Sequence, residues 1–184
     1  MKYEEKLVRS VKNPDGYLWW EDTSTFSYLD GIANDSYLKG TTQGFLTAAI
    51  IYHQLTEKIL LLLIQYSDLF LQARAYPAKL DTSYNDLDSF GKLIKRHATT
   101  VVFSKKSRII KNAVHLNDLR VQLVHKIHEL EIEENIDSVA IQIHDNFERI
   151  FQDWKEAMKW FHAQLDLLKS QPTWQRLFEK YSFR

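Results

Sequence analysis

Apolar residues recur along most of this chain at the three- and four-residue spacing of an α-helix. The strongest segment predicts a helix over about 41–75, which is apolar on nearly every side between residues 59 and 64. Pro77 cannot continue a helix and is expected to close it. A helix without a polar face is buried by its neighbours, so we expect this one at the centre of the fold.

Two further helices are predicted in the middle of the chain. Residues 86–98 place apolar side chains on one helical face, and the β-branched run at 99–102 predicts a connector. Ser104 is a suitable N-cap for a third helix that continues to about Leu130.

A last long helix is predicted over about 135–170, because its apolar positions between Ile136 and Phe161 alternate by four and three residues. Pro172 interrupts it, and a short terminal helix is expected over 173–181. No repeat or linker divides the 184 residues. The pattern predicts one all-α domain, an up-and-down helical bundle with motif-bearing helices over 41–130 and the C-terminal helices over 135–182.

Residues 1–40 show no clear period, and we expect an irregular, aromatic-rich N-terminal extension. The turn signal at 13–16 predicts either a short hairpin or two loose segments. Its aromatic side chains are expected to cover one side of the helical core, with a base-stacking platform as the alternative. They are Trp19, Trp20, Phe26, Tyr28 and Tyr37.

Composition narrows the possible chemistry. The absence of cysteine excludes disulfides and thiolate metal sites and fits a reducing compartment. The first residues lack a secretory signal, and the Leu60–Ile64 run is too short to span a bilayer. Five scattered glycines make a phosphate-cradling loop improbable. We therefore expect a cytoplasmic protein without a membrane anchor, cofactor or metal.

The net charge is zero, but the charges are strongly segregated. Residues 92–128 carry nine Lys or Arg and one acid, whereas residues 129–156 carry nine acids and two bases. Such a split favours an anionic ligand on the basic side, or else two segments that pack together and neutralise each other. The candidate RNA-binding residues are Lys92, Arg96, Lys105, Lys106, Arg108 and Lys111.

The basic segment also carries Arg120 and His125, the candidate catalytic pair. Arg presents a planar fork of donors to a phosphate, and His moves protons near neutral pH, so the two together would cleave a phosphodiester without metal. Five positions advance about 500° along a helix, which leaves the side chains roughly 140° apart. We expect both to face a groove that another surface completes.

The central helix carries Gln54, Glu57 and Lys58, and a later helix carries the Arg120-x4-His125 motif. In this order the two motifs resemble the HEPN superfamily of small all-α domains, many of which are metal-independent ribonucleases. The resemblance implies a homodimer with a composite site, products with 2′,3′-cyclic phosphate and 5′-hydroxyl ends, and a role with an antitoxin or other protein partner in defence. In that family a polar residue usually follows the Arg, whereas here it is Val121.

Four polar residues are candidates for supporting roles: Asn117, Asp118, Glu57 and His53. Asn117 and Asp118 precede Arg120 by one turn and are candidates to replace the polar residue lost at Val121. Glu57 either orients or neutralises Arg120, or it forms a polar stripe with His53 four positions earlier. The alternative to catalysis is a non-catalytic interaction module that dimerises or docks a partner through the apolar seam at 136–161.

Overall fold

The computed structural model describes residues 3–18, 23–81, 89–125 and 133–182, and these residues form helices joined by short connections. The elements are α1 (Tyr3–Lys12), α2 (Asp15–Leu18), α3 (Thr23–Leu38), α4 (Thr42–Ala75), α5 (Phe90–Arg96), a 3-10 turn (His97–Thr99), α6 (Lys106–His125), α7 (Glu133–Lys169) and α8 (Pro172–Ser182). The predicted all-α class and packed helical bundle are confirmed.

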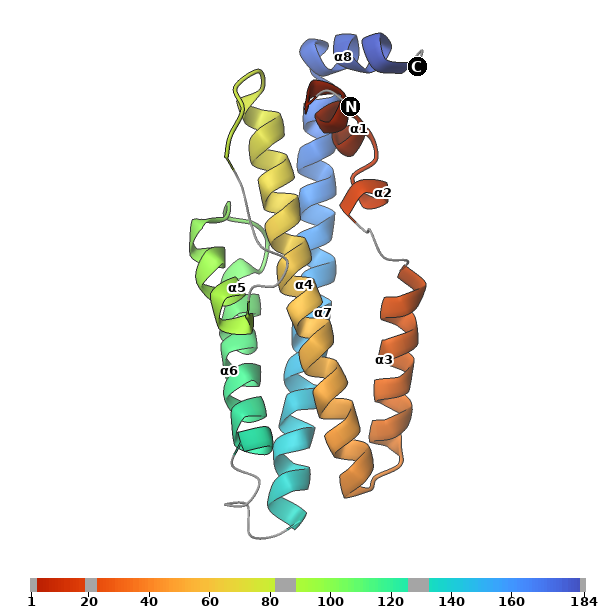
Figure 1. The fold of residues 1–184 in the computed structure, drawn as a ribbon, viewed down its shortest axis with the longest axis vertical. Coiled ribbons are helices and arrows are strands. Elements are labelled where there is room, and N and C mark those ends of the chain that lie inside the picture. Colours follow the sequence, from red (N-terminus) through yellow and green to blue (C-terminus); the bar gives the residue numbers. More distant parts are fainter. Residues whose placement is uncertain (1–2, 19–22, 82–88, 126–132, 183–184) are drawn as a thin grey trace.

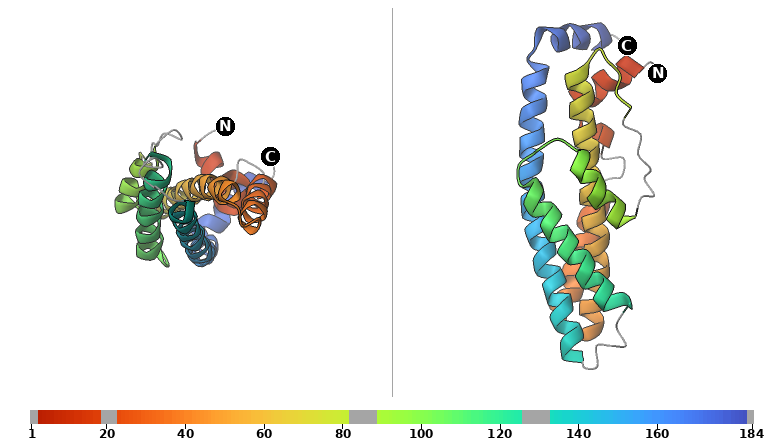
Figure 2. Two further views of the ribbon diagram at one scale, coloured as in Figure 1. Left: turned by 90° about the horizontal axis from the view of Figure 1, so that it is seen from below. Right: turned by 90° about the vertical axis from the view of Figure 1, so that its left-hand side faces the viewer.

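The long helices alternate in direction along the bundle: α3 and α6 run one way, and α4 and α7 run the other (Figure 1). α4 and α7 form the centre, with α3 on one flank and α6 on the other. Seen from the side, α5 lies beside the first part of α6, and α8 crosses the end of the bundle where α1 also lies (Figure 2). Lys180 of α8 pairs there with Glu4 of α1 at 2.9 Å.

The central helix agrees with its prediction. α4 begins where the Thr41 Oγ1 accepts a hydrogen bond from the Gly44 N–H at 3.2 Å, and it ends at Ala75, before Pro77. Every residue from Ile59 to Ser67 is buried. By length and apolar composition α4 would suffice to cross a membrane, but 61% of its most apolar stretch is buried inside the bundle, as in the core helix of a soluble protein.

The long C-terminal helix is also confirmed, with bounds one or two residues from those predicted. Its seam is buried against α4 and α6, with Ile143, Phe147, Ile150 and Phe161 fully enclosed. The seam at 136–161 therefore builds the core of this chain. The seam that the alternative interpretation assigns to a partner is occupied by α4 and α6 of the same chain.

The start of α6 differs from the prediction. Ser104 lies in a turn and Lys105, at φ 64°, directly precedes the helix, which begins at Lys106. The Lys106 Nζ donates hydrogen bonds to the carbonyls of Thr100 and Val101 at 2.8 and 3.2 Å, so this lysine satisfies two carbonyls of the connector. Residues 126–130, the predicted end of this helix, lie outside the described residues, as do residues 86–88 at the predicted start of the second.

The irregular N-terminal extension is the clearest error, because most of the described N-terminal segment is helical. The turn signal at 13–16 is a real break, where the Asn13 Oδ1 accepts from the Gly16 N–H at 3.2 Å, but helices lie on both sides of it. α1 buries Leu7, Val8 and Val11, and α3 packs along α4.

Two of the predicted aromatic contacts are present. Phe26 lies 5.5 Å from Trp154, and Tyr37 stacks on His144 at 4.0 Å between ring centroids. Tyr28 is 68% exposed and does not cover the core, which corrects that prediction. Trp19 and Trp20 lie outside the described residues.

Candidate functional site

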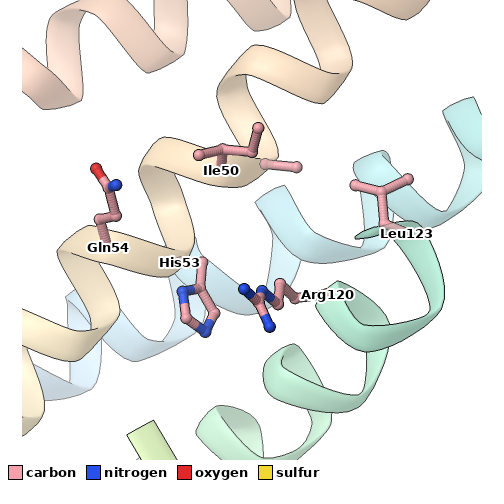
Figure 3. Close-up of a pocket in the computed structure, with 6 residues that line it drawn as sticks. Ile50, His53, Gln54, Arg120 and Leu123 are labelled. Carbon is pink, nitrogen blue, oxygen red and sulfur yellow. The ribbon is translucent and has the colours of Figure 1, made fainter. Parts of the chain in front are cut away.

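A surface pocket of about 210 Å³ lies between α4 and α6, near the start of α5, where Phe90 stacks on His53 of the pocket wall (Figure 3). Its walls are Ala49, Ile50, His53, Gln54, Arg120 and Leu123. α4 contributes four of these residues because positions 49, 50, 53 and 54 recur on one helical face. Arg120 reaches from α6 toward His53, so the predicted catalytic arginine borders a cavity (Figure 3).

His53 is held in place from two sides. Its ring stacks on Phe90 of α5 with centroids 4.5 Å apart, and Asn117 of α6 hydrogen-bonds its side chain. Its Nε2 is buried and has no hydrogen-bond partner among the described residues. Burial lowers the pKa of His53 to about 4, and the nearby Arg120 charge acts in the same direction. The ring is therefore neutral at pH 7.

Glu57, one turn along α4, faces the same arginine. Burial raises the pKa of the Glu57 carboxyl, whereas the charges of Lys58 and Arg120 lower it. The structure thus brings the carboxylate within electrostatic reach of the guanidinium, as expected if Glu57 neutralises Arg120.

The other predicted site residues are only partly assembled. Asn117 joins the cluster through His53, but Asp118 is exposed on α6. His125 is the last residue of α6, and its side chain lies outside the described residues. Val121 is half-buried directly after Arg120, so the polar groups near the arginine come from α4 and from Asn117.

Several of the predicted RNA-binding cations have partners within the fold. The Arg108 Nε donates to the buried Asp153 Oδ2 at 2.8 Å, and its Nη2 donates to the other carboxylate oxygen. Arg96 pairs with Asp68 at 3.2 Å, and Lys106 holds the connector before α6. The Arg108–Asp153 pair shows that the basic and acidic segments do neutralise each other in part.

The three remaining cations are exposed. Lys92, Lys105 and Lys111 lie on the surface of α5, of the turn before α6 and of α6 itself. Their exposure leaves them within reach of an anionic ligand at the surface. The charge segregation therefore overstates the basic surface, because it counts cations that stabilise the fold.

Sequence reasoning did not identify the apolar part of the pocket or the role of Phe90. Ala49, Ile50 and Leu123 look like ordinary positions of amphipathic helices. The available signal was that Gln54, Glu57 and Lys58 are polar on a helix otherwise predicted to be buried, and that Ile50 precedes Gln54 by four positions, on the same helical face.

The site is built from two helices that are distant in sequence and adjacent in space (Figure 3). It offers one guanidinium, one carboxylate, a neutral imidazole and two amides beside an apolar wall. In the described parts of the chain, no three His, Asp or Glu side chains converge as metal ligands do. Comparisons of the chain with protein-family models, curated proteins and solved structures give no match.

Proposed function

We propose that this chain is a HEPN-like endoribonuclease that binds RNA at the α4–α6 pocket and cleaves its backbone with Arg120 and His125, without a metal. One observation carries the proposal: Arg120 borders a surface pocket together with a neutral histidine, within electrostatic reach of Glu57 and five positions before His125 at the end of α6. Arginine in such a setting is suited to hold a phosphate oxygen.

In the proposed reaction His125 accepts the proton of a ribose 2′-hydroxyl, or it donates a proton to the departing 5′-oxygen. The 2′-oxygen forms a bond to phosphorus and the bond from phosphorus to the 5′-oxygen breaks. Arg120 stabilises the negative charge that develops on the phosphate oxygens. The products carry a 2′,3′-cyclic phosphate and a 5′-hydroxyl.

Glu57 and His53 prepare the arginine for this role. The Glu57 carboxylate balances the charge of Arg120 while RNA is absent, and His53 adds no second cation because it is neutral at pH 7. A single strong cation favours one phosphate over diffuse binding of the whole RNA backbone. Lys92, Lys105 and Lys111 are exposed candidates for contacts farther along the strand.

A homodimer fits this proposal. Arg120 and His125 are roughly 140° apart on α6, so one helix alone does not direct both toward a single phosphate. A second copy that presents its own α6 would place its histidine beside the arginine of the first. An antitoxin or other protein partner would control access to the same face.

The test is RNA cleavage in EDTA by purified wild type, Arg120→Ala, His125→Ala and His115→Ala. His115 is an exposed histidine of α6 and serves as the matched control. We expect wild type and His115→Ala to release 2′,3′-cyclic phosphate ends, and the two site variants to be slower by about 10²-fold or more.

Absence of cleavage by folded, dimeric wild type would refute the ribonuclease. It would favour the alternative, a non-catalytic HEPN-like module that dimerises or binds a partner. Such a module would have to use a surface other than the 136–161 seam, which is buried in the bundle.

A further inference from the structure

The size of the α4–α6 pocket limits what it can receive. Its volume is about 210 Å³, below the roughly 300–1,000 Å³ of pockets that enclose drug-sized ligands. It would hold one ring system, but not an oligonucleotide or a peptide helix. The occupant is therefore a small part of a larger ligand, or a small molecule.

The walls of the pocket differ in chemistry. Ala49, Ile50 and Leu123 form an apolar surface that a bare phosphate would leave unused. Ile50 is 50% exposed at the rim, whereas Leu123 is buried, so the apolar surface is open to solvent on the side of α4. Apolar walls of this kind favour the flat face of a ring.

The polar walls carry only one full positive charge. Gln54 is exposed and offers an amide with both donors and an acceptor, and His53 offers a neutral ring. The charged groups that face His53 are Arg120 from α6 and, through that arginine, Glu57 from its own helix. An uncharged heterocycle with polar edges, attached to one anionic group, matches this distribution.

We propose that the pocket binds the nucleobase next to the phosphate held by Arg120, with Ile50 against the face of the base and Gln54 at its polar edge. This inference rests on the proposed function, because it takes the anionic group to be an RNA phosphate. The pocket then determines which nucleotide flanks the cleaved bond. Single bases are commonly recognised by stacking and by hydrogen bonds to their edges.

The first experiment measures binding of inorganic phosphate, ribose 5-phosphate and the four nucleoside 3′-monophosphates to the full chain by calorimetry. We expect at least one nucleotide to bind about tenfold or more tightly than ribose 5-phosphate, since the base adds contact with the apolar wall that ribose 5-phosphate lacks. Equal affinity for all six ligands would overturn the proposal.

Two variants locate the effect. Ile50→Trp fills the mouth of the pocket and should reduce nucleotide affinity to that of ribose 5-phosphate. Val114→Trp is the matched control, because Val114 is a 40% exposed residue of α6 that does not line the pocket. Gln54→Ala should change the order of affinity among the four nucleotides. Unaltered nucleotide binding in both Ile50→Trp and Gln54→Ala would refute the proposal that the pocket binds the base.

The binding experiments and the cleavage test can fail independently of each other. Nucleotide binding that depends on Ile50, in a protein that cleaves no RNA, would refute the ribonuclease and support the base pocket. Cleavage that is lost in Arg120→Ala but keeps its rate and sequence preference in Ile50→Trp would support the ribonuclease and refute the base pocket.

Discussion

Acid should weaken this fold through one buried histidine, His97, which is 1% exposed at the junction of α5 and α6. Its Nε2 lies 3.0 Å from the Leu60 carbonyl of α4, and a carbonyl only accepts, so Nε2 carries the proton. Its Nδ1 is buried without a partner among the described residues. Burial lowers the pKa of His97 to about 4, and the Lys106 and Arg96 charges act in the same direction, against the Leu60 hydrogen bond.

The direction in which stability changes with pH follows from the pKa of His97 in the unfolded and folded states. The unfolded chain titrates near 6.5 and the folded chain near 4, so between these values the unfolded state binds more protons. Stability from the neutral ring is complete above about pH 6.5 and is lost as the pH falls toward 4. With about 1.36 kcal/mol per pKa unit, the loss is about 2 kcal/mol at pH 5 and about 3 kcal/mol when complete.

The assay is urea unfolding of wild type and His97→Gln at pH 7 and pH 5. Protonation of His53 should also destabilise the fold in acid. Protonation of Glu57 and Asp68, whose pKa values are raised by burial, should instead stabilise it. The variant retains these three groups, so the difference between the two proteins isolates His97. We expect His97→Gln to be destabilising at pH 7 and its deficit to shrink by about 2 kcal/mol at pH 5. An equal deficit at both pH values would refute a neutral buried His97.

Three further predictions concern stability and are checked by urea or thermal unfolding. Gly44→Ala should destabilise the fold by about 1–3 kcal/mol, because the new Cβ would lie 2.3 Å from the Ser36 carbonyl oxygen of α3. Gly91→Ala is the control: nothing lies within 4 Å of its new Cβ, so it should stabilise the fold by about 0.5–1 kcal/mol. Equal effects of the two substitutions would contradict the close α3–α4 packing. Lys105→Gly should stabilise by up to about 1 kcal/mol, since glycine adopts φ 64° without strain, and a loss would show that the Lys105 side chain matters. Ser67→Ala should cost about 1–2 kcal/mol, because the hydroxyl accepts the Val101 N–H at 3.0 Å, and an unchanged midpoint would argue against that bond.

The long helices were predictable because their burial is periodic. α4 and α7 each carry apolar residues at spacings that only a helix places on a common face, and their bounds were predicted to within two residues. α3 was not predictable in the same way. Its apolar residues are spread around the helix and not gathered on one face, and Gly31, Asn34 and Asp35 are weak helix formers, so its helical form depends on packing along α4 and not on its own pattern.

The candidate site was predictable as residues but not as a cluster. Spacing on one helix suggested that His53 and Glu57 lie on a common face, and the Arg120-x4-His125 motif suggested the pair on α6. The rotation of α4 against α6 decides whether these faces meet, and it depends on the packing of both helices on α7. The pattern of either helix alone does not predict that rotation. The contact of Phe90 with His53 and the apolar wall of the pocket could therefore not be inferred from the sequence.

Cations that bind a ligand and cations that stabilise the fold look alike in sequence, and Arg108 shows how the two can be distinguished. Asp153 lies three residues after Ile150 and four before Ala157, which puts a carboxylate on the buried seam of α7. A buried carboxylate needs a donor, and the neighbouring helix α6 supplies Arg108. An acid at a seam position therefore assigns a structural role to one cation of the adjacent helix. Lys111, one turn later, is exposed and remains available for the proposed RNA contact.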